Sequence, residues 1–449
     1  MGNCCLNSAP EFLQELVYTS FANLKVYDRD SDGTIKGRSN VQFELSSPVL
    51  QSSLNCKLNN HAIRITGCAI PGLDPRKNRA KDCQDTYAIV EKGNVIMTSL
   101  FDGHGKEGKK ISHFCRDFMS NYLENNYEDI ESDPIGNIER MTVLCDEALK
   151  KSDIDSILSG TTAVVVLFTS TGIHVGSVGD SRAVLSTIPK TNTPYQVPAA
   201  SYYNRFKRPV LPLRILKAIP LTIDQKPNHF DELKRIIASG GFVERVKDEI
   251  GNEIGPFRVW KKRGIMPGLA VSRSIGDRMA KEVGVISTPV NHTFPLYFNR
   301  DQFIVIASDG IWDTMENLEV VNFVERFRHS SKFSSGASDF PVNTNNSTIA
   351  RLLCEEARYR WFGIIEDEDV VIDDISCVII EMNCLEPSTT IEPESSTEER
   401  NIKGFQSITT IDESKKEDEK ARESAEPGKV KVVRRDFVRG STAAVEENE

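Results

Sequence analysis

The sequence predicts an α+β fold in which helices cover stacked antiparallel sheets. Three observations indicate this class: short runs rich in β-branched residues, longer segments with the period of amphipathic helices, and an order in which runs of strands alternate with pairs of helices. The 449 residues, of which 39% are hydrophobic, can form the core of one large domain or of two average ones.

The strands are expected where β-branched runs are bounded by turn residues. These runs cover residues 61–70, 86–91, 94–101, 162–170, 172–180, 182–186, 303–308 and 375–382. The stretch TSTG (169–172) lies between two of them and indicates a hairpin connection. We therefore expect mainly antiparallel pairing.

The helices are expected in longer segments whose apolar residues lie on one face. These segments are 108–126, 135–155, 229–241, 317–329 and 346–361. Gly240 and Gly241 end the third segment, as glycine commonly ends helices. Cys115 and Cys145 occupy apolar positions of the first two segments, and we expect both in the core.

Composition divides the chain into three parts. Residues 1–60 carry few periodic signals and are expected to be a leader and an extension, whereas residues 61–384 have the pattern of a globular domain. Residues 385–449 are polar, charged and nearly free of aromatic residues, so we expect a disordered tail. The Pro-rich, basic stretch 191–220 is expected to be an inserted surface loop, which either docks an acidic or phosphorylated partner or only decorates the surface.

Charge and cysteine content argue against several classes of protein. The net charge of −10 argues against nucleic-acid binding, because nucleic-acid binders are usually basic. The ten cysteines form no CxxC pair and the first 20 residues lack a secretory signal, so we expect an intracellular protein with reduced thiols. No uncharged apolar window is long enough for a transmembrane helix.

The N-terminal sequence MGNCC carries a pattern of lipid attachment. Removal of the initiator Met exposes Gly2 for myristoylation, and Cys4 and Cys5 are candidates for palmitoylation. Two acyl chains would anchor the protein stably at the cytoplasmic face of a membrane, with a remaining cytosolic pool. Leu6 stands where Ser or Thr is preferred, and the alternative is a disordered leader that only happens to begin with Met-Gly.

Acidic residues stand at the ends of three apolar strands. The strand ending at Phe101 runs into Asp102, the strand ending at Ser308 runs into Asp309, and Asp373 lies just before the last strand. If these strand ends meet at one sheet edge, their carboxylates repel one another unless cations lie between them. Mg²⁺ or Mn²⁺ suits such oxygen ligands, and two ions close together stabilise both the attacking and the leaving oxygen in phosphoryl transfer.

The residues after Asp102 suit the same chemistry. Gly103 would let its backbone carbonyl approach a metal ion, and Gly105 would allow a tight turn. His104, between the two glycines, would move a proton, because imidazole exchanges protons near neutral pH.

Seven stretches occur in the order found in the metal-dependent PPM/PP2C serine/threonine protein phosphatases, and together they resemble that family. They are FDGHG, VGDSRAVL, LTIDQKP, RIIASGGFV, LAVSRSIGD, FIVIASDGIWD and DDISCVII. The resemblance covers residues 61–384 and implies an αββα sandwich, with helix pairs outside two antiparallel sheets and metals in the cleft between the sheet edges. The implied activity is hydrolysis of phosphoserine and phosphothreonine in proteins.

The resemblance also implies roles for individual residues. Asp102 would bridge two metal ions, with Asp309 and Asp373 completing the protein ligands of the first and the Gly103 carbonyl contributing to the second. A bridging water or hydroxide would attack phosphorus in line, so no phosphoenzyme would form. His104 resembles the general acid that protonates the departing oxygen.

A weaker third metal site is implied for Asp180 together with Asp309 and Asp313. Family members often carry Glu-Asp or Gln-Asp at the start of the first long strand, where this chain has Gln84 and Asp85. The neutral Gln84 would bind the second metal through water or not at all, and Asp85 would hold a metal-bound water.

Two further positions depart from the family pattern. The Arg or Lys that grips phosphate in the family falls on Ala80, which Arg79 and Lys81 flank. Either neighbour can substitute, and Arg79 is favoured because its planar guanidinium matches a phosphate. The usual Asp-Asn pair is Asp373-Asp374, whose extra charge can alter metal affinity.

Two hypotheses for the function follow. The first is an active enzyme, a monomer whose partners are phosphorylated proteins, and it is favoured because every main ligand is present. The second is an inactive phosphatase fold that captures partners through the 191–220 loop. Metal-dependent release of phosphate distinguishes the two.

Other features receive structural interpretations. Residues 28–39 imitate a calcium-binding EF-hand loop, but Ser39 stands where a bidentate Glu is required, and an acidic turn is preferred. Arg273 and Asp277 are expected to pair with each other in support of the cleft. Trp312 is expected to contribute to packing.

Overall fold

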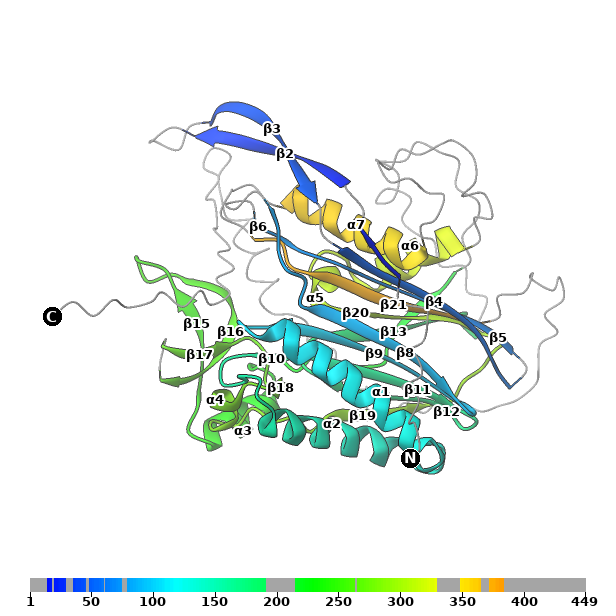
Figure 1. Ribbon diagram of the computed structural model, residues 1–449. Coiled ribbons are helices and arrows are strands. Elements are labelled where there is room, and N and C mark those ends of the chain that lie inside the picture. Colours follow the sequence, from blue (N-terminus) through cyan, green and yellow to red (C-terminus); the bar gives the residue numbers. More distant parts are fainter. Residues whose placement is uncertain are drawn as a thin grey trace, which may run out of the picture. The chain divides into compact units, whose positions relative to one another are not determined.

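Two antiparallel sheets lie face to face, and a pair of helices covers each outer face (Figure 1). The computed structural model describes residues 14–17, 20–29, 35–45, 48–59, 61–74, 79–190, 215–262, 265–328, 348–364 and 371–382. Within 14–48, and at positions 79, 80 and 364, the description is limited to the backbone. The layers confirm the αββα sandwich. No helix in these ranges is both long and apolar enough to span a bilayer.

The first sheet has seven strands. In spatial order they are β1 (Gln14–Val17), β4 (Pro48–Leu58), β5 (His61–Ile70), β21 (Ile375–Met382), β20 (Asp301–Ala307), β13 (Arg182–Thr187) and β14 (Lys217–Pro220). β4 pairs with β5 from Leu50 to Leu58, so the sheet begins before residue 61. β14 lies at the end of the segment expected to be an irregular loop, and it is ordered by pairing with β13. The central β20 and β21 are buried along their whole length, as their continuous apolar sequences indicate.

The second sheet also has seven strands. Along one path they are β18 (Ile275–Gly276), β10 (Gly160–Thr161), β9 (Val95–His104), β11 (Ala163–Thr169), β12 (Gly172–Val178) and β19 (Val290–Phe294), and β8 (Asp85–Lys92) pairs with the other side of β9. β11 and β12 form the expected hairpin. β8 and β9 of this sheet contact β5 and β21 of the first sheet.

Two long helices, α1 (Gly108–Ser132) and α2 (Pro134–Lys151), pack on the second sheet. α2 begins where the Asp133 side chain accepts a hydrogen bond from the Gly136 backbone N–H, and Pro134 supplies the first helical residue. Its last turn carries Lys150 and Lys151, whose positive charges interact favourably with the negative end of the helix dipole. α1 continues past residue 126, the limit expected from the sequence, to Ser132.

The first sheet is covered by α6 (Asn317–Arg328) and α7 (Ile349–Ile364). Three shorter helices are α3 (Phe230–Ala238), α4 (Arg278–Lys281) and α5 (Asp309–Trp312). α3 ends as predicted, because Gly240 has a φ of +83°, a left-handed conformation that glycine adopts without strain.

Each helix pair encloses a hydrophobic core against its sheet. Cys115 and Cys145 are buried in the core under α1 and α2, and Trp312 is buried in the core under α6 and α7. These three expectations are confirmed. A further contact joins the two sheets, because the Tyr87 ring of β8 lies against Gly67 of β5 and Ser52 Oγ donates to Tyr87 Oη at 3.0 Å.

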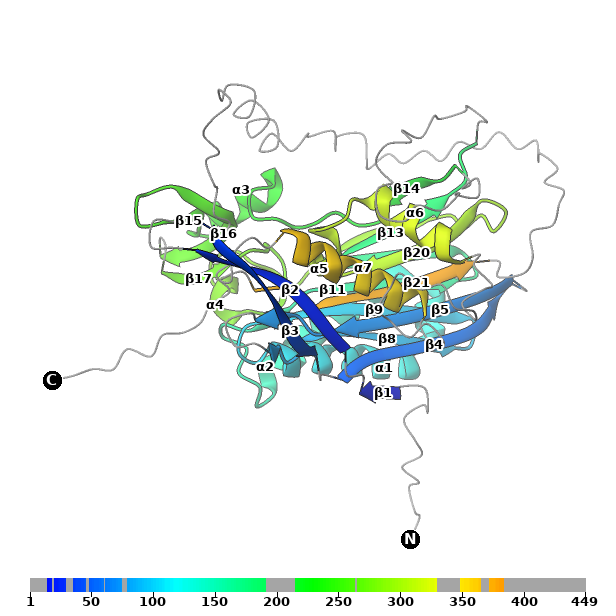
Figure 2. The same ribbon diagram turned by 90° about the horizontal axis from the view of Figure 1, so that it is seen from above.

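Three small sheets lie outside the sandwich and were not expected from the sequence. The largest consists of β15 (Phe242–Lys247), β16 (Glu253–Lys262) and β17 (Met266–Leu269) (Figure 2). The others are the pairs β2 (Ser20–Arg29) with β3 (Ile35–Leu45), and β6 (Leu73–Asp74) with β7 (Arg79–Ala80). β2 and β3 contain the two ends of the calcium-loop-like stretch 28–39, so strands flank it where an EF-hand requires helices.

Several sequence predictions concern positions outside the described residues. They are the lipidation of Gly2, Cys4 and Cys5, the insertion over residues 191–214 and the tail 385–449. All of them stay predictions.

Replacing Gly67 with valine is expected to lower the free energy of unfolding by about 1–3 kcal/mol, a typical cost of overpacking. A Cβ at this position would lie 2.3 Å from the Tyr87 ring, which is fully buried and cannot move aside freely. Unfolding in urea, followed by circular dichroism, measures the change.

Gly363→Ala provides the matched control. Among the described atoms, nothing lies within 4 Å of a Cβ added to Gly363 in α7, and alanine favours a helix, so stability should be unchanged or higher by up to about 1 kcal/mol. If Gly67→Val were as stable as the wild type, the two sheets would not be in the close contact described.

Candidate active site

Two buried carboxylates face each other at one end of the second sheet. Asp85 opens β8 and is the register partner of Asp102, near the end of β9. Each is only 3% exposed. The Asp102 backbone is fixed by Thr162, whose Oγ1 accepts from the Asp102 N–H at 3.1 Å and whose N–H donates to the Asp102 carbonyl at 2.9 Å.

The first sheet brings two more carboxylates to its own end. Asp309 begins α5 immediately after β20, and Asp373 lies just before β21. β20 and β21 pair antiparallel, with Ala307 opposite Cys377, so the end of one strand meets the beginning of the other. The predicted convergence of Asp309 and Asp373 on one end of the sheet is therefore observed.

Ser376 joins the acids of the two sheets. Its Oγ donates to Asp85 Oδ2 at 2.8 Å, and its backbone N–H donates to the Oγ of Ser308 at 3.0 Å, next to Asp309. Both serines are fully buried. The first β21 residues therefore connect the second-sheet pair to the turn that carries Asp309.

The electrostatics of this cluster favour a cation. The pKa of Asp85 is raised to about 7, first by burial and then by the negative charges of Asp374 and Asp373. Asp85 Oδ1 is buried and has no hydrogen-bond partner among the described residues. Carboxylates of this kind are the oxygen donors that Mg²⁺ and Mn²⁺ prefer.

The acids approach one another without forming a finished metal cage. Over the described ranges, no three Asp, Glu, His or Cys side chains are already grouped closely enough to hold an ion. Asp102, Asp85, Asp309 and Asp373 nevertheless lie at the ends of β9, β8, β20 and β21, and β21 contacts both β8 and β9. The residues present therefore fit a divalent cation site.

Two glycines allow the backbone after Asp102 to turn. A Cβ on Gly103 would lie 2.5 Å from the Gly108 carbonyl oxygen, so only glycine permits this close approach. Gly105 has a φ of +83°, in the left-handed region that favours glycine. The sequence FDGHG therefore ends a buried strand in this way because the chain must pass close to α1 and then reverse.

Gln84 and Asp374 hold backbone segments around the acids. The Gln84 side-chain amide donates to the Gly105 carbonyl at 2.8 Å, so it is engaged by the turn. The two Asp374 oxygens accept from the backbone N–H groups of Gly72, at 2.6 Å, and Gln84, at 2.9 Å. A carboxylate suits two donors better than an Asn amide would, since one end of the amide is itself a donor.

His104 has a partner that the sequence analysis assigned elsewhere. Its Nε2 donates to Asp277 Oδ2 at 2.7 Å, and Asp277 is 3% exposed. Burial would raise the pKa of Asp277, but the interactions with His104, Ser274 and Lys281 lower it overall, so the carboxylate stays charged. Because Nε2 is occupied, Nδ1 is the ring nitrogen left to exchange a proton.

The expected pair of Arg273 with Asp277 is wrong. Arg273 donates to Glu232, with Nη2 2.7 Å from Oε1, and to the Thr288 carbonyl at 2.8 Å. Asp277 has a φ of +46°, a left-handed conformation that is uncommon for a residue other than glycine. This local reversal separates the two side chains, which sequence proximity alone had suggested would meet.

Two lysines approach the acids. Lys81 Nζ lies 3.4 Å from Asp373 Oδ1 and 3.8 Å from Asp374 Oδ1. Arg79, the predicted phosphate ligand, belongs to β7, and its side chain lies outside the described atoms. Lys81 thus places a cationic side chain beside these acids.

Lys226 forms a salt bridge with Asp180, in the connection between β12 and β13. Burial would lower the pKa of Lys226, but the attraction of Asp180, followed by Asp224, Asp309 and Asp313, raises it overall. Asp180, Asp309 and Asp313 are the residues expected at a third metal site. Sequence analysis missed Lys226, although it lies within the quoted motif LTIDQKP, and it assigned Asp277 of LAVSRSIGD to Arg273 and not to His104.

Comparison with known proteins agrees with this geometry. The family model "Protein phosphatase 2C" matches residues 82–360. "Probable protein phosphatase 2C 34" of Arabidopsis thaliana is 30% identical over 321 residues, which cover 67% of this chain and 76% of that protein. "Probable protein phosphatase 2C 14" of Oryza sativa subsp. japonica is 28% identical over 373 residues, which cover 73% of this chain and 63% of that protein.

Solved structures show the same fold. A serine-threonine phosphatase 2C from Toxoplasma gondii superposes with a TM-score of 0.52 at 17% sequence identity, covering 75% of this chain and 99% of that one. A sex determining protein of C. elegans gives a TM-score of 0.51 at 16% identity, covering 71% and 64%. Since the family model spans more than half of the sequence and the sandwich is shared, this chain belongs to the protein phosphatase 2C family and is a protein-serine/threonine phosphatase.

Proposed function

We propose that this phosphatase hydrolyses phosphoserine and phosphothreonine with two divalent cations, Mg²⁺ or Mn²⁺, at the joined ends of the two sheets, and that water is the nucleophile. The observation that carries the proposal is the buried Asp85–Asp102 pair, which Ser376 links to the turn of Asp309. The raised pKa of Asp85 supports it, because this carboxylate lies in negative surroundings that a cation would neutralise.

The side chains of Asp102, Asp309 and Asp373 and the carbonyl of Gly103 would hold the cations, with Asp85 placed to bind a water beside them. When bound, such ions lower the pKa of coordinated water and offset the charge of the phosphoryl oxygens. The protein itself contributes the buried position of Asp102 and Asp85, which excludes bulk water from one side of the ligand set.

His104 would protonate the serine or threonine oxygen as it leaves. A serine or threonine alkoxide is a poor leaving group, so a proton delivered from Nδ1 lowers the barrier. Asp277 accepts the hydrogen bond of Nε2 and so orients the ring, which leaves Nδ1 for the substrate. Asp277 is therefore a positioning residue that acts through His104.

Lys81 would contact a phosphate oxygen of the substrate. It lies at hydrogen-bonding distance from Asp373, one of the candidate ligands, and its ammonium would offset the negative charge of an incoming phosphate. Arg79 is close in sequence and stays a second candidate for this role.

We further propose that the protein acts as an acylated monomer at the cytoplasmic face of a membrane, with a cytosolic pool. The support is the sequence MGNCC, in which a myristoylation glycine lies beside Cys4 and Cys5. Two chains together would anchor the protein far better than one.

Asp309→Ala is expected to reduce hydrolysis of a phosphothreonine peptide by about 100-fold or more, because a whole ligand of the charge-stabilising site is lost. Phosphate release by the purified full chain in Mn²⁺ measures the rate, and EDTA should abolish it in the wild type. Asp153→Ala, which removes an exposed acid after α2, is the control and should keep full activity. Wild-type activity that survives chelation would exclude the metal mechanism.

Asp277→Asn is expected to slow the hydrolysis of a phosphothreonine peptide by about tenfold or more, because it removes part of the roughly 10²–10⁴-fold that a general acid contributes. An aryl phosphate such as p-nitrophenyl phosphate should be affected much less, because its leaving group needs no proton. The ratio of the two kcat values is the measurement, and it is insensitive to the fraction of folded enzyme. Equal losses on both substrates would mean that Asp277 does not act through proton transfer.

Wild-type protein expressed with a labelled myristate analogue should incorporate label and sediment with membranes, whereas Gly2→Ala should do neither. Replacing Cys4 and Cys5 with serine should keep the myristate label and shift the protein to the soluble fraction. A wild-type protein that is soluble and carries no label would refute the anchor.

A further inference from the structure

The acidic subsite formed by Asp180, Asp309 and Asp313 already contains a cation. Lys226 Nζ donates to Asp180 Oδ2, and the carboxylates of Asp309 and Asp313 attract the same ammonium. The Asp180 side chain is only 6% exposed, so this salt bridge lies largely out of water.

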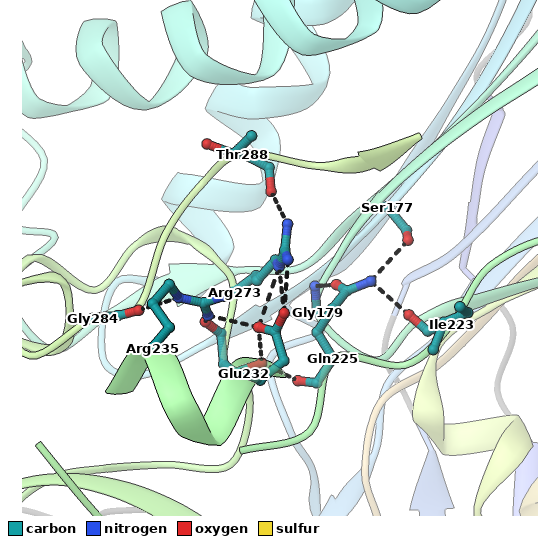
Figure 3. Close-up of polar contacts among 10 residues, drawn as sticks. Ser177, Gly179, Ile223, Gln225, Glu232, Arg235, Arg273, Gly284 and Thr288 are labelled. Atoms are coloured by element: carbon teal, nitrogen blue, oxygen red, sulfur yellow. Dashed lines mark hydrogen bonds and ion pairs between the residues drawn. The ribbon is translucent and has the colours of Figure 1, made fainter. Parts of the chain in front are cut away.

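A pair of backbone-anchored hydrogen bonds fixes the two partners relative to each other. The Gln225 N–H donates to the Gly179 carbonyl at 2.9 Å, and the Gly179 N–H donates to Gln225 Oε1 at 2.6 Å. Gly179 directly precedes Asp180, and Gln225 directly precedes Lys226. The Gln225 side chain is held further by its Nε2, which donates to Ser177 Oγ at 3.1 Å (Figure 3).

The same segment is tied to α3 through a buried acid. Ser272 donates from its N–H to the Gln225 carbonyl, and its Oγ, 3.0 Å from the same carbonyl, donates to Glu232 Oε2 at 2.6 Å. Arg235 and Arg273 both donate to Glu232, as Figure 3 shows. Lys226 is therefore presented to Asp180 by a connected set of buried hydrogen bonds, unlike a mobile lysine on an open surface.

Asp224, the other acid close to Lys226, forms its salt bridge with Arg182. Arg182 donates from Nε and Nη2 to the two oxygens of Asp224, at 2.9 and 2.8 Å, and its guanidinium lies 5.1 Å from the centre of the Trp312 ring. This two-point contact fixes Asp224, so Lys226 cannot draw closer to it without disturbing a well-formed pair. Asp180 is the direct partner that remains for Lys226 in this arrangement.

We propose that Lys226 takes the place of a third divalent cation, so that this chain holds two ions where the family resemblance implies a third. An ion bound to Asp180 would be pressed against an ammonium that buried hydrogen bonds keep in position, and like charges at such a distance repel strongly. The inference rests on the two-ion site proposed above, and it differs from the expectation that Asp180 and Asp313 bind metal.

Manganese binding by the full chain tests the proposal. Equilibrium dialysis over a range of Mn²⁺ concentrations, with the electron paramagnetic resonance signal of free Mn²⁺ as readout, counts the ions bound per chain. We expect two ions for the wild type and one more for Lys226→Gln, because removal of the ammonium leaves Asp180, Asp309 and Asp313 without their internal cation. Lys226→Arg keeps the charge and should keep the wild-type count.

A second substitution makes the test independent of how well Lys226→Gln folds. Asp180→Asn in the wild-type background should leave the number of bound ions unchanged, and in the Lys226→Gln background it should remove the extra ion. The proposal is overturned if Lys226→Gln binds no more ions than the wild type, or if Asp180→Asn alone loses an ion. A different result would refute the proposed two-ion phosphatase mechanism itself: a wild type that binds fewer than two ions or releases no phosphate in Mn²⁺.

Discussion

Repulsion between carboxylates that the fold forces together is the constraint on which the active end of this molecule depends. β8 and β9 place Asp85 opposite Asp102, and β20 and β21 bring Asp309 and Asp373 to the same end. Strand pairing fixes the backbone of Asp85 and Asp102 directly, and it fixes the strand ends next to which Asp309 and Asp373 lie. Burial, and after it the negative charges of Asp374 and Asp373, raise the pKa of Asp85 to about 7, so near neutral pH this carboxyl keeps its proton for much of the time unless a cation approaches.

The protein offsets this repulsion in three ways. Hydroxyl donors such as Ser376 bind one oxygen of a buried acid, and backbone N–H groups bind both oxygens of Asp374. Lysine side chains supply full charges, with Lys81 beside Asp373 and Lys226 on Asp180. Hydroxyl and amide donors replace the hydrogen bonds to water that a buried carboxylate loses, whereas a lysine competes directly with a metal ion for the same carboxylate oxygens. The two lysines therefore influence how many ions the acids can accept.

The sequence predicted the parts of the fold that depend on local signals. The β20 and β21 runs are continuous and apolar because both faces are buried, and the acids that end or begin them stand out for that reason. β15 to β17 were missed because their residues are mostly half-exposed and show no clean alternation. β4 was missed because its polar residues obscure the period that its pairing with β5 imposes.

The sequence predicted those site residues that can be recognised singly, such as an acid at the end of an apolar strand. It did not predict contacts between residues that are far apart in the chain. Asp277 lies 173 positions from His104, and no spacing rule connects them. The nearer Arg273 was a plausible partner for Asp277 only while the chain between them was assumed to run without the left-handed turn at Asp277. Such a pair depends on the tertiary structure. The loop that carries Asp277 is held next to β10 by the hydrogen bond from the Asp277 N–H to the Ser159 carbonyl.

The segment from Gln225 to Thr288 carries two residues that act on other site residues, Lys226 on Asp180 and Asp277 on His104. It carries Lys226 near its beginning and Asp277 near its end, and Glu232 binds both Arg273 and the Ser272 hydroxyl between them. Three donors hold that carboxylate, which overcomes the effect of its burial and lowers the pKa of Glu232 to about 2. Glu232 therefore stays charged around neutral pH, and its contacts with Arg235, Ser272 and Arg273 do not respond to pH there.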